Sequence, residues 1–414
     1  MRILFFSTAF PQPYEPSRNP DNLERCVALS RQHPVRVMSP YSWLHLRSAI
    51  ESHDHLSSRG LLVDRPVFFY PPGVFRGAHA WCMWQGIRAA AARLVRTFQP
   101  DAVLSYWTYP DTAVATAVAR LARIPCVAIV GGSDVLAIDP EAPGAAGRRA
   151  RRVLEAVDGI AAVSDSIKHR IVALGISPSK IGVLGAAVDK AVFVPGSRQD
   201  ARQQLGIGGT AEVLVWVGRM VAVKALDVLL DVVARLKTSR PNLRLYLIGD
   251  GPLRRSLESR VAAAGLASHV VFVGRVPHRD LAAYYRAADL TILPSEWEGM
   301  PNTLLESHAC GTAFVATAVG AVPQLAIPDV DELVRPGDQE QLAAAITRAL
   351  TRPRDARVSA SKVGGWDEMA DQLADLLQRA RSSRRITGAP AAVSLREKAR
   401  MHPRPSSRHS WHAR

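Results

Sequence analysis

Two glutamates eight residues apart, Glu298 and Glu306, mark the stretch of the chain best suited to chemistry. An apolar run at 290–293 precedes them, and Gly299 permits a tight turn. Pro301 suits the first position of a helix, because its missing N–H would be unpaired there anyway. Free N–H groups at a helix start bind anions. The pattern predicts two carboxylates flanking an anion site, a layout that fits the sugar, diphosphate and ribose of a nucleotide sugar.

Each carboxylate has a candidate role at such a site. Glu298 would hold sugar hydroxyls near the reacting carbon. Glu306 would accept two ribose hydroxyls, since a carboxylate has two acceptor oxygens. Two alternatives stay open: Glu296 competes for the sugar, although Trp297 turns it elsewhere, and Glu306 could be an ordinary surface glutamate of a helix.

Two cations could supply the counter-charge that a diphosphate needs. Gly218 and Arg219 end an apolar run, and Lys224 follows at the start of an expected helix. The helix dipole disfavours a lysine in the first turn, and a bound anion would remove that penalty. We therefore expect Arg219 and Lys224 to clamp the diphosphate and stabilise it as the leaving group. The alternative is two solvated surface cations.

Glycine turns follow two further apolar runs of the second half. Gly249 and Gly251 follow one run, and Gly274, Arg275 and Val276 follow the next. Because glycine lets a ligand approach the backbone, these turns are expected to share a donor-binding rim with Gly218. Plain turns are the alternative interpretation.

The first half offers one candidate side chain, Asp134, after an apolar run and two glycines. It either faces a cleft, where it would orient an acceptor hydroxyl or the donor sugar, or it caps a helix. The histidines form no HExxH pattern, and no Asp-x-Asp pair stands at the end of an expected strand. No metal site and no cofactor are therefore expected.

The composition narrows the class of protein. The chain has 414 residues, of which 48% are apolar and 21% charged, which suits two globular domains. No run of eighteen apolar residues occurs, so no transmembrane helix is expected. The four cysteines form no CxxC pair, which fits a cytoplasmic protein with free thiols.

The net charge of +15 is spread unevenly. Residues 1–190 contain 22 basic and 15 acidic residues, residues 191–378 contain 20 and 21, and residues 379–414 contain 10 and 1. The basic first half would suit a weak contact with an anionic membrane surface, so that the protein would be peripheral to the inner face of the membrane. Nucleic-acid binding would rest on the tail alone and is not expected.

Short apolar runs alternate with helical patterns along the chain, which is typical of parallel strands buried on both faces. We expect an α/β fold with two Rossmann-like, doubly wound domains that face a central cleft. The expected divisions are an acceptor-side domain at 1–190, a linker at 191–210, a donor-binding domain at 211–365, a final helix at 366–378 and a basic disordered tail at 379–414.

Together these motifs resemble glycosyltransferase family 4, the retaining group 1 enzymes of the GT-B fold that include glycogen synthase and mannosyltransferases. The resemblance is specific over residues 205–345, through several motifs in family order: Val217–Arg219, Lys224, Leu247–Pro252, Phe272–Val276, Glu298–Glu306 and Ala309–Thr312. The first half matches more loosely, through Gly132–Val135 and Ala187–Asp189.

The resemblance implies transfer of a sugar from a nucleoside diphosphate sugar to a glycan or lipid-linked acceptor, with retention and without a metal. Polysaccharide, exopolysaccharide or glycolipid biosynthesis is the implied setting. It assigns the diphosphate to Arg219 and Lys224, the sugar to Glu298 and the ribose to Glu306. The segment that would line the sugar and phosphate consists of Gly299, Met300, Pro301, Asn302, Thr303 and Leu304. The final helix would cross back to the first domain.

The chain also departs from the family pattern. Ala9–Pro13 stands where the family has a glycine-rich loop, and Ala225 stands where glycine is usual. Two other functions are compatible with the same fold: a nucleotide-sugar epimerase or phosphorylase, and a non-catalytic nucleotide-sugar binding protein. A dehydrogenase is not expected, because no GxGxxG follows the first strand.

Overall fold

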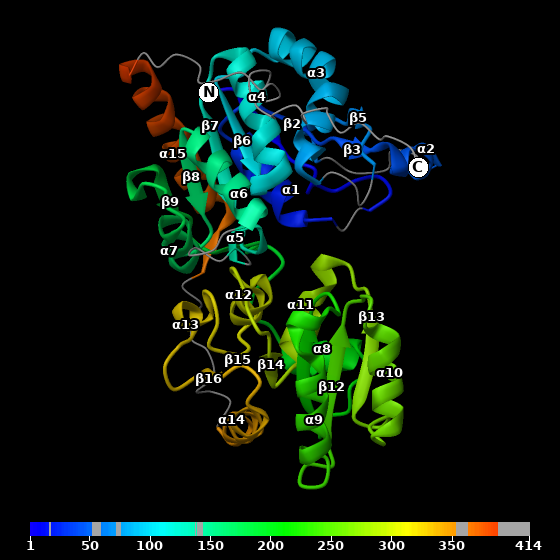
Figure 1. Ribbon diagram of the computed structural model, residues 1–414. Coiled ribbons are helices and arrows are strands. Elements are labelled where there is room, and N and C mark those ends of the chain that lie inside the picture. Colours follow the sequence, from blue (N-terminus) through cyan, green and yellow to red (C-terminus); the bar gives the residue numbers. More distant parts are fainter. Residues whose placement is uncertain are drawn as a thin grey trace, which may run out of the picture.

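A computed structural model describes residues 1–15, 18–51, 59–71, 76–136, 138, 144–352 and 363–387 of the chain. Two large sheets form the centres of two domains, which lie one above the other in Figure 1. Neighbouring strands are parallel throughout both sheets, as in the pairs β1–β6 and β11–β12. The predicted α/β architecture with two parallel-sheet domains is therefore confirmed.

The first domain has a seven-stranded sheet in the order β4-β2-β1-β6-β7-β8-β9. Its strands are β1 (Ile3–Phe6), β2 (Val35–Met38), β4 (Leu62–Asp64), β6 (Ala102–Tyr106), β7 (Cys126–Val130), β8 (Gly159–Ala162) and β9 (Ile181–Val183). Its helices are α1 (Pro20–Ser30), α2 (Leu46–Glu51), α3 (His79–Phe98), α4 (Ala113–Ala122), α5 (Ser133–Leu136), α6 (Gly144–Ala156) and α7 (Asp165–Ala173). A small separate sheet pairs β3 (Tyr41–Ser42) with β5 (Val67–Phe68).

The second domain has a six-stranded sheet in the order β13-β12-β11-β14-β15-β16. Its strands are β11 (Glu212–Val217), β12 (Leu243–Ile248), β13 (Val270–Gly274), β14 (Leu290–Leu293), β15 (Phe314–Thr317) and β16 (Glu332–Val334). Its helices are α8 (Arg198–Gln204), α9 (Leu226–Leu236), α10 (Arg254–Ala263), α11 (Leu281–Ala287), α12 (Asn302–Ala309), α13 (Val322–Leu325) and α14 (Gln339–Thr351). The strand order reverses between β11 and β14, as in a doubly wound fold.

Helices cover both faces of each sheet, and this explains the continuous apolar runs in the sequence. All residues of β1, β7 and β14 are buried. Helix α9 shows the complementary pattern, because Leu226, Leu229, Leu230 and Val233 lie at helical spacing and are buried against the second sheet. Among the described residues, no helix is long and apolar enough to cross a membrane.

The last described helix, α15 (Trp366–Thr387), packs in the core of the first domain, beside β7 and β8 (Figure 1). Leu373 and Leu377 are fully buried there. The helix continues past residue 378, so the predicted start of a disordered tail at 379 is wrong. The physical reason is ion pairing: Arg381 lies 3.0 Å from Asp101, and Arg384 lies 3.0 Å from Asp158. The rest of the predicted tail, from residue 388, lies outside the described residues.

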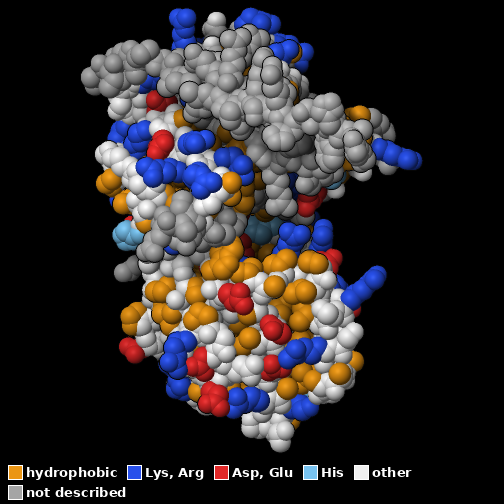
Figure 2. Space-filling view, viewed as in Figure 1, with side chains coloured by type: hydrophobic (Ala, Val, Ile, Leu, Met, Phe, Trp, Pro, Cys, Tyr) orange, Lys and Arg blue, Asp and Glu red, His pale blue; other side chains and the backbone are white. Residues whose placement is uncertain are grey.

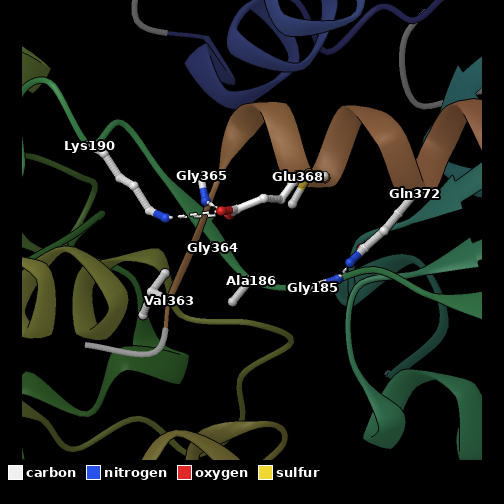
Figure 3. A pocket seen from close by; sticks show the side chains of 9 residues that line it. Gly185, Ala186, Lys190, Val363, Gly364, Gly365, Glu368 and Gln372 are labelled. Carbon is white, nitrogen blue, oxygen red and sulfur yellow. Dashed lines mark hydrogen bonds and ion pairs between the residues drawn. The ribbon is translucent and has the colours of Figure 1, made fainter. Parts of the chain in front are cut away.

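The chain crosses between the domains beside a second small sheet, in which β10 (Ala187–Val188) pairs with β17 (Gly364–Gly365). Figure 3 shows the polar side chains that tie the two crossings together. Glu368 of α15 accepts hydrogen bonds from Lys190 Nζ, at 3.3 Å, and from the Gly365 N–H. Gln372 accepts a bond of 2.7 Å from the Gly185 N–H.

A buried ion-pair network fixes the beginning of the second domain. Asp289, which immediately precedes β14, is only 8% exposed and lies 2.9 Å from Arg202 and 2.8 Å from Arg198 of α8. The same carboxylate accepts a 2.7 Å bond from the N–H of Val213 in β11. One buried charge therefore joins α8 to the two central strands of the sheet.

Replacing Asp289 with alanine should destabilise the second domain by about 3–5 kcal/mol, because the buried guanidinium of Arg202 would lose the carboxylate that balances its charge. The free energy of unfolding from urea titration measures this. Glu258→Ala, which removes a partly exposed pair with Arg254, is the control and should cost less than about 1 kcal/mol. Equal costs for the two variants would contradict the assigned role of Asp289.

Candidate active site

The predicted donor residues gather at the carboxyl ends of β11 and β14, where the strand order of the second sheet reverses. Gly218 and Arg219 follow β11, and Glu298 follows β14. Ligands of doubly wound sheets bind at this edge. The edge faces the first domain, since the backbone of Gly299 lies against that of Gly131.

Backbone segments approach one another here too closely for side chains. A Cβ atom on Gly249 would collide with the carbonyl oxygen of Gly218, and one on Gly251 would lie 2.6 Å from the Met220 nitrogen. A Cβ on Gly320 would collide with the carbonyl of Glu298. Gly249 and Gly251 are expected above to let a ligand approach the backbone. In the structure the space beside both glycines is occupied by backbone atoms of the loop that follows β11.

Lys224 and Glu298 form the central charged contact of the site. Lys224 Nζ lies 2.6 Å from Glu298 Oε1, which also accepts a 2.6 Å bond from the Ser295 hydroxyl. The Glu298 side chain is only 10% exposed and that of Lys224 is 23% exposed. Glu296, by contrast, is exposed. The buried pair therefore places Glu298, rather than Glu296, next to a cation of the expected clamp.

The local conformation around Lys224 differs from the prediction. Lys224 ends a short 3-10 helix, Ala222–Lys224, and α9 begins only at Leu226, so the lysine is not in the first turn of an α-helix. Ala225 between them has a left-handed conformation with φ of 45°. This explains why the resembled family favours glycine there, since a Cβ in this region costs about 1–2 kcal/mol.

The two predicted arginines are both available to a ligand. Arg219 is exposed, and no described residue forms a hydrogen bond or ion pair with its guanidinium. Arg275 is 71% exposed and lies 3.7 Å from Asp250, which itself accepts a bond from the Gly251 N–H. Val276 follows on the same loop and packs in the cluster beneath the site.

Helix α12 begins one residue later than expected. Pro301 is its N-cap residue, and Asn302 is its first residue. Leu304 N–H bonds back to the Pro301 carbonyl at 3.0 Å, whereas the N–H groups of Asn302 and Thr303 have no acceptor among the described residues. The helix start therefore presents two free donors, as an anion site requires. Met300 packs against core residues of both domains.

Glu306 lies inside α12 and is buried, and both of its oxygens have partners within the protein. Oε1 is 2.7 Å from His278 Nε2, and Oε2 accepts a 2.8 Å bond from the Tyr285 hydroxyl. Burial acts to lower the pKa of His278, but the hydrogen bond and charge of Glu306 outweigh it and raise the pKa. A ribose would share this carboxylate with, or displace, one of these partners.

The first domain reaches the site through Asp21 and the loop at Gly131–Gly132. Asn302 Nδ2 donates a hydrogen bond to the Asp21 carboxylate across the domain boundary. A Cβ on Gly299 would lie 2.5 Å from the Gly131 carbonyl oxygen. The domains are therefore in direct contact at the start of α12.

Asp134 is partly exposed and lies inside α5 rather than at its N-cap position, and its carboxylate bonds to neighbouring loops. Its oxygens accept bonds of 2.8 Å from the Thr108 hydroxyl and 2.8 Å from the Gly132 N–H. Burial raises the pKa of this carboxyl. Asp134 thus holds the loop that touches Gly299.

The sequence pattern missed Asp21, His278 and Tyr285. The helical spacing of apolar residues in α11 signals that Tyr285 is buried, but not that its hydroxyl meets Glu306. Asp21 follows a proline at a helix start, which predicts its helix but not its contact with the other domain. No group of three or more His, Cys, Asp or Glu side chains suited to a metal occurs among the described residues.

Comparisons with known proteins identify the family and the fold of the chain. The family model for glycosyl transferases group 1 matches residues 197–364, and the model for glycosyltransferase family 4 matches residues 22–192. The Anabaena protein HepE, solved in complex with UDP-glucose, superposes with a TM-score of 0.68 and 19% identity, covering 94% of this chain and all of that one. At this identity the likeness establishes the fold.

Relatives include D-inositol 3-phosphate glycosyltransferases. The one from Streptosporangium roseum is 34% identical over 260 residues, which is 59% of either chain, so the matched part spans little more than half of that relative. The one from Frankia alni is 31% identical over 314 residues, 70% of this chain and 75% of the relative. With both halves of the chain matched in order, the protein belongs to the group 1, family 4 glycosyltransferases of the GT-B fold.

Proposed function

We propose that the protein transfers a sugar from a nucleoside diphosphate sugar to a glycan or lipid-linked acceptor, with retention at the anomeric carbon. The setting would be polysaccharide or glycolipid biosynthesis. The observation that carries the proposal is the buried Lys224–Glu298 pair beside the free N–H groups of α12. It sets positive charge where a diphosphate would sit and a carboxylate where the sugar would sit.

The expected role of each charged group and N–H donor in the reaction follows from its charge and position. When the bond to the sugar breaks, negative charge develops on the leaving diphosphate and positive charge on the sugar ring. Arg219, Lys224 and the N–H groups of Asn302 and Thr303 would stabilise the diphosphate. Glu298 would hold the sugar hydroxyls and face the developing positive charge. Lys224 and Glu298 are held by hydrogen bonds before the ligand arrives, which limits the reorganisation that the reaction requires.

Glu306 would bind the ribose, and its hydrogen bonds to His278 and Tyr285 would orient it. A carboxylate can accept about four hydrogen bonds, so the two present leave capacity for ribose hydroxyls. HepE, which shares the fold, was solved with UDP-glucose bound, and this makes uridine diphosphate sugars the first donors to test. Adenosine and guanosine diphosphate sugars complete the panel.

We further propose that the first domain contacts an anionic membrane surface weakly. Helix α6 carries four arginines, of which Arg148, Arg151 and Arg152 are exposed. Arg149 stacks over Tyr109, with 5.4 Å from the guanidinium carbon to the ring centre. Figure 2 shows Lys and Arg side chains gathered on the part of the first domain where Figure 1 places α6. Such a surface attracts anionic lipids.

Replacing Arg219 with alanine should lower the rate of sugar transfer at least tenfold, because a charge-assisted donor to the diphosphate is lost. Steady-state rates with each radiolabelled donor of the panel measure this. Arg279→Ala is the matched control and should keep its rate, because this arginine of the 3-10 helix His278–Asp280 has a side chain that is 81% exposed. An unchanged rate in the Arg219 variant would refute the clamp.

The variants Glu298→Gln and Lys224→Met should show that recognition of the sugar and recognition of the diphosphate depend on different residues. Lys224→Met should weaken the binding of the free nucleoside diphosphate at least tenfold, whereas Glu298→Gln should leave it within about twofold. Glu298→Gln should instead abolish most transfer from the intact donor. Calorimetric titration and the transfer assay provide the two readouts. Equal loss of diphosphate affinity in both variants would show that the pair acts as one structural unit.

Membrane contact should be salt-sensitive. At about 10 mM salt the protein should sediment with vesicles of an anionic phospholipid, and at about 0.5 M salt it should not, since charges are then screened. Arg148→Ala combined with Arg152→Ala should weaken the binding about tenfold or more, at about 1 kcal/mol for each charge. Arg244→Ala with Arg255→Ala in the second domain is the control. Absence of binding at low salt would refute the contact.

A further inference from the structure

A pocket of about 260 Å³ opens in the first domain beside the carboxyl ends of β1 and β6. Thr8, just after β1, and Pro110, shortly after β6, form one wall, and the small β3–β5 sheet forms another. The order of the first sheet reverses between β1 and β6. This is the position at which doubly wound sheets bind ligands, yet no group of the donor site lines it.

Aromatic rings dominate the walls of this pocket. Tyr14 and His45 stack with ring centres 4.5 Å apart, and Tyr70 and His79 stack at 4.1 Å. Their faces are apolar, whereas their hydroxyl and ring N–H groups provide hydrogen bonds at the edges. A sugar ring has the complementary character, because its C–H groups form apolar faces and its hydroxyls point outward.

The pocket carries little net charge. Its single guanidinium, from Arg18, is compensated by Glu15 at 3.1 Å. Burial lowers the pKa of His79, so this ring is neutral at pH 7. The volume lies just below the roughly 300 Å³ at which pockets for drug-sized ligands begin, so it suits one ring rather than an extended chain. An uncharged monosaccharide unit fits these properties better than a phosphate does.

The rim of the pocket is apolar and faces solvent. Leu44, which lines the pocket, is 49% exposed, and its neighbour Trp43 is 42% exposed. Trp43 stacks on Phe69, which is 59% exposed, with ring centres 5.3 Å apart. Large apolar side chains exposed together mark binding surfaces more often than single ones do.

The pocket also connects with the donor site along the chain. Arg18 lies three residues before Asp21, which bonds to Asn302 at the start of α12. Residues 18–21 therefore line the pocket at one end and contact the start of α12, the proposed diphosphate site, at the other.

We propose that this pocket binds an uncharged pyranose ring of the acceptor and that the apolar rim holds the hydrocarbon to which the ring is attached. The acceptor is then a lipid-linked saccharide rather than a free glycan. This inference rests on the proposed function, to which it adds a site and a class of acceptor.

Binding of simple glycosides tests the proposal. Hexyl and methyl glycosides of glucose, galactose, mannose and N-acetylglucosamine, kept below the micelle concentration, are titrated into the full-length protein by calorimetry. At least one sugar should bind, and its hexyl form should bind at least tenfold more tightly than its methyl form. Tyr14→Ala should weaken both forms at least tenfold, and Leu44→Ser should remove only the advantage of the hexyl form.

Tyr14→Phe keeps the ring and should retain most of the affinity, which separates stacking from a loss of fold. The proposal is overturned if no glycoside binds, if the hexyl and methyl forms bind equally, or if Tyr14→Ala binds like the wild type. Nucleoside diphosphate binding, measured in the same samples, reports on the second domain. Its loss together with intact glycoside binding would count against the proposed donor and not against this pocket.

Discussion

Backbone contacts that only glycine permits hold the donor site together. Gly249 lies against the carbonyl of Gly218, and Gly320 lies against that of Glu298. These contacts hold the loops after four strands, β11, β12, β14 and β15, against one another, so that Arg219 and Glu298 lie at the same edge of the sheet. Any larger residue at either glycine would force the loops apart and separate the charges that they carry. The chemistry of the site therefore depends on the absence of side chains as much as on the side chains present.

Much of this arrangement could be predicted from local sequence. Apolar runs predict strands well, as with the run at 290–293, which is β14, because strands buried on both faces are apolar throughout. The site residues of the second domain were predictable because they follow those strands directly. Glycine turns and a proline-initiated helix are local signals, and parallel topology brings the ends of the strands together.

Long-range contacts were not predictable in the same way. The partners of Glu306 come from a 3-10 helix and a buried face of α11, and nothing in the sequence links them. The contact between Asp21 and Asn302 spans the domain boundary, and the stacking of Arg25 between Tyr106 and Trp366 joins three elements. The extension of α15 is not evident from sequence because its basic residues resemble those of a tail, whereas two of them pair with carboxylates of the first domain.

The return of α15 to the first domain has a consequence for biosynthesis of the chain. Leu373 and Leu377 complete a core whose other members lie almost entirely before residue 190. During translation the faces of β7 and β8 that receive this helix remain uncovered while the whole second domain emerges from the ribosome. The second domain, whose sheet is built from residues 212–334, can close first. The first domain, although made first, can therefore complete its core only after the second domain has been synthesised.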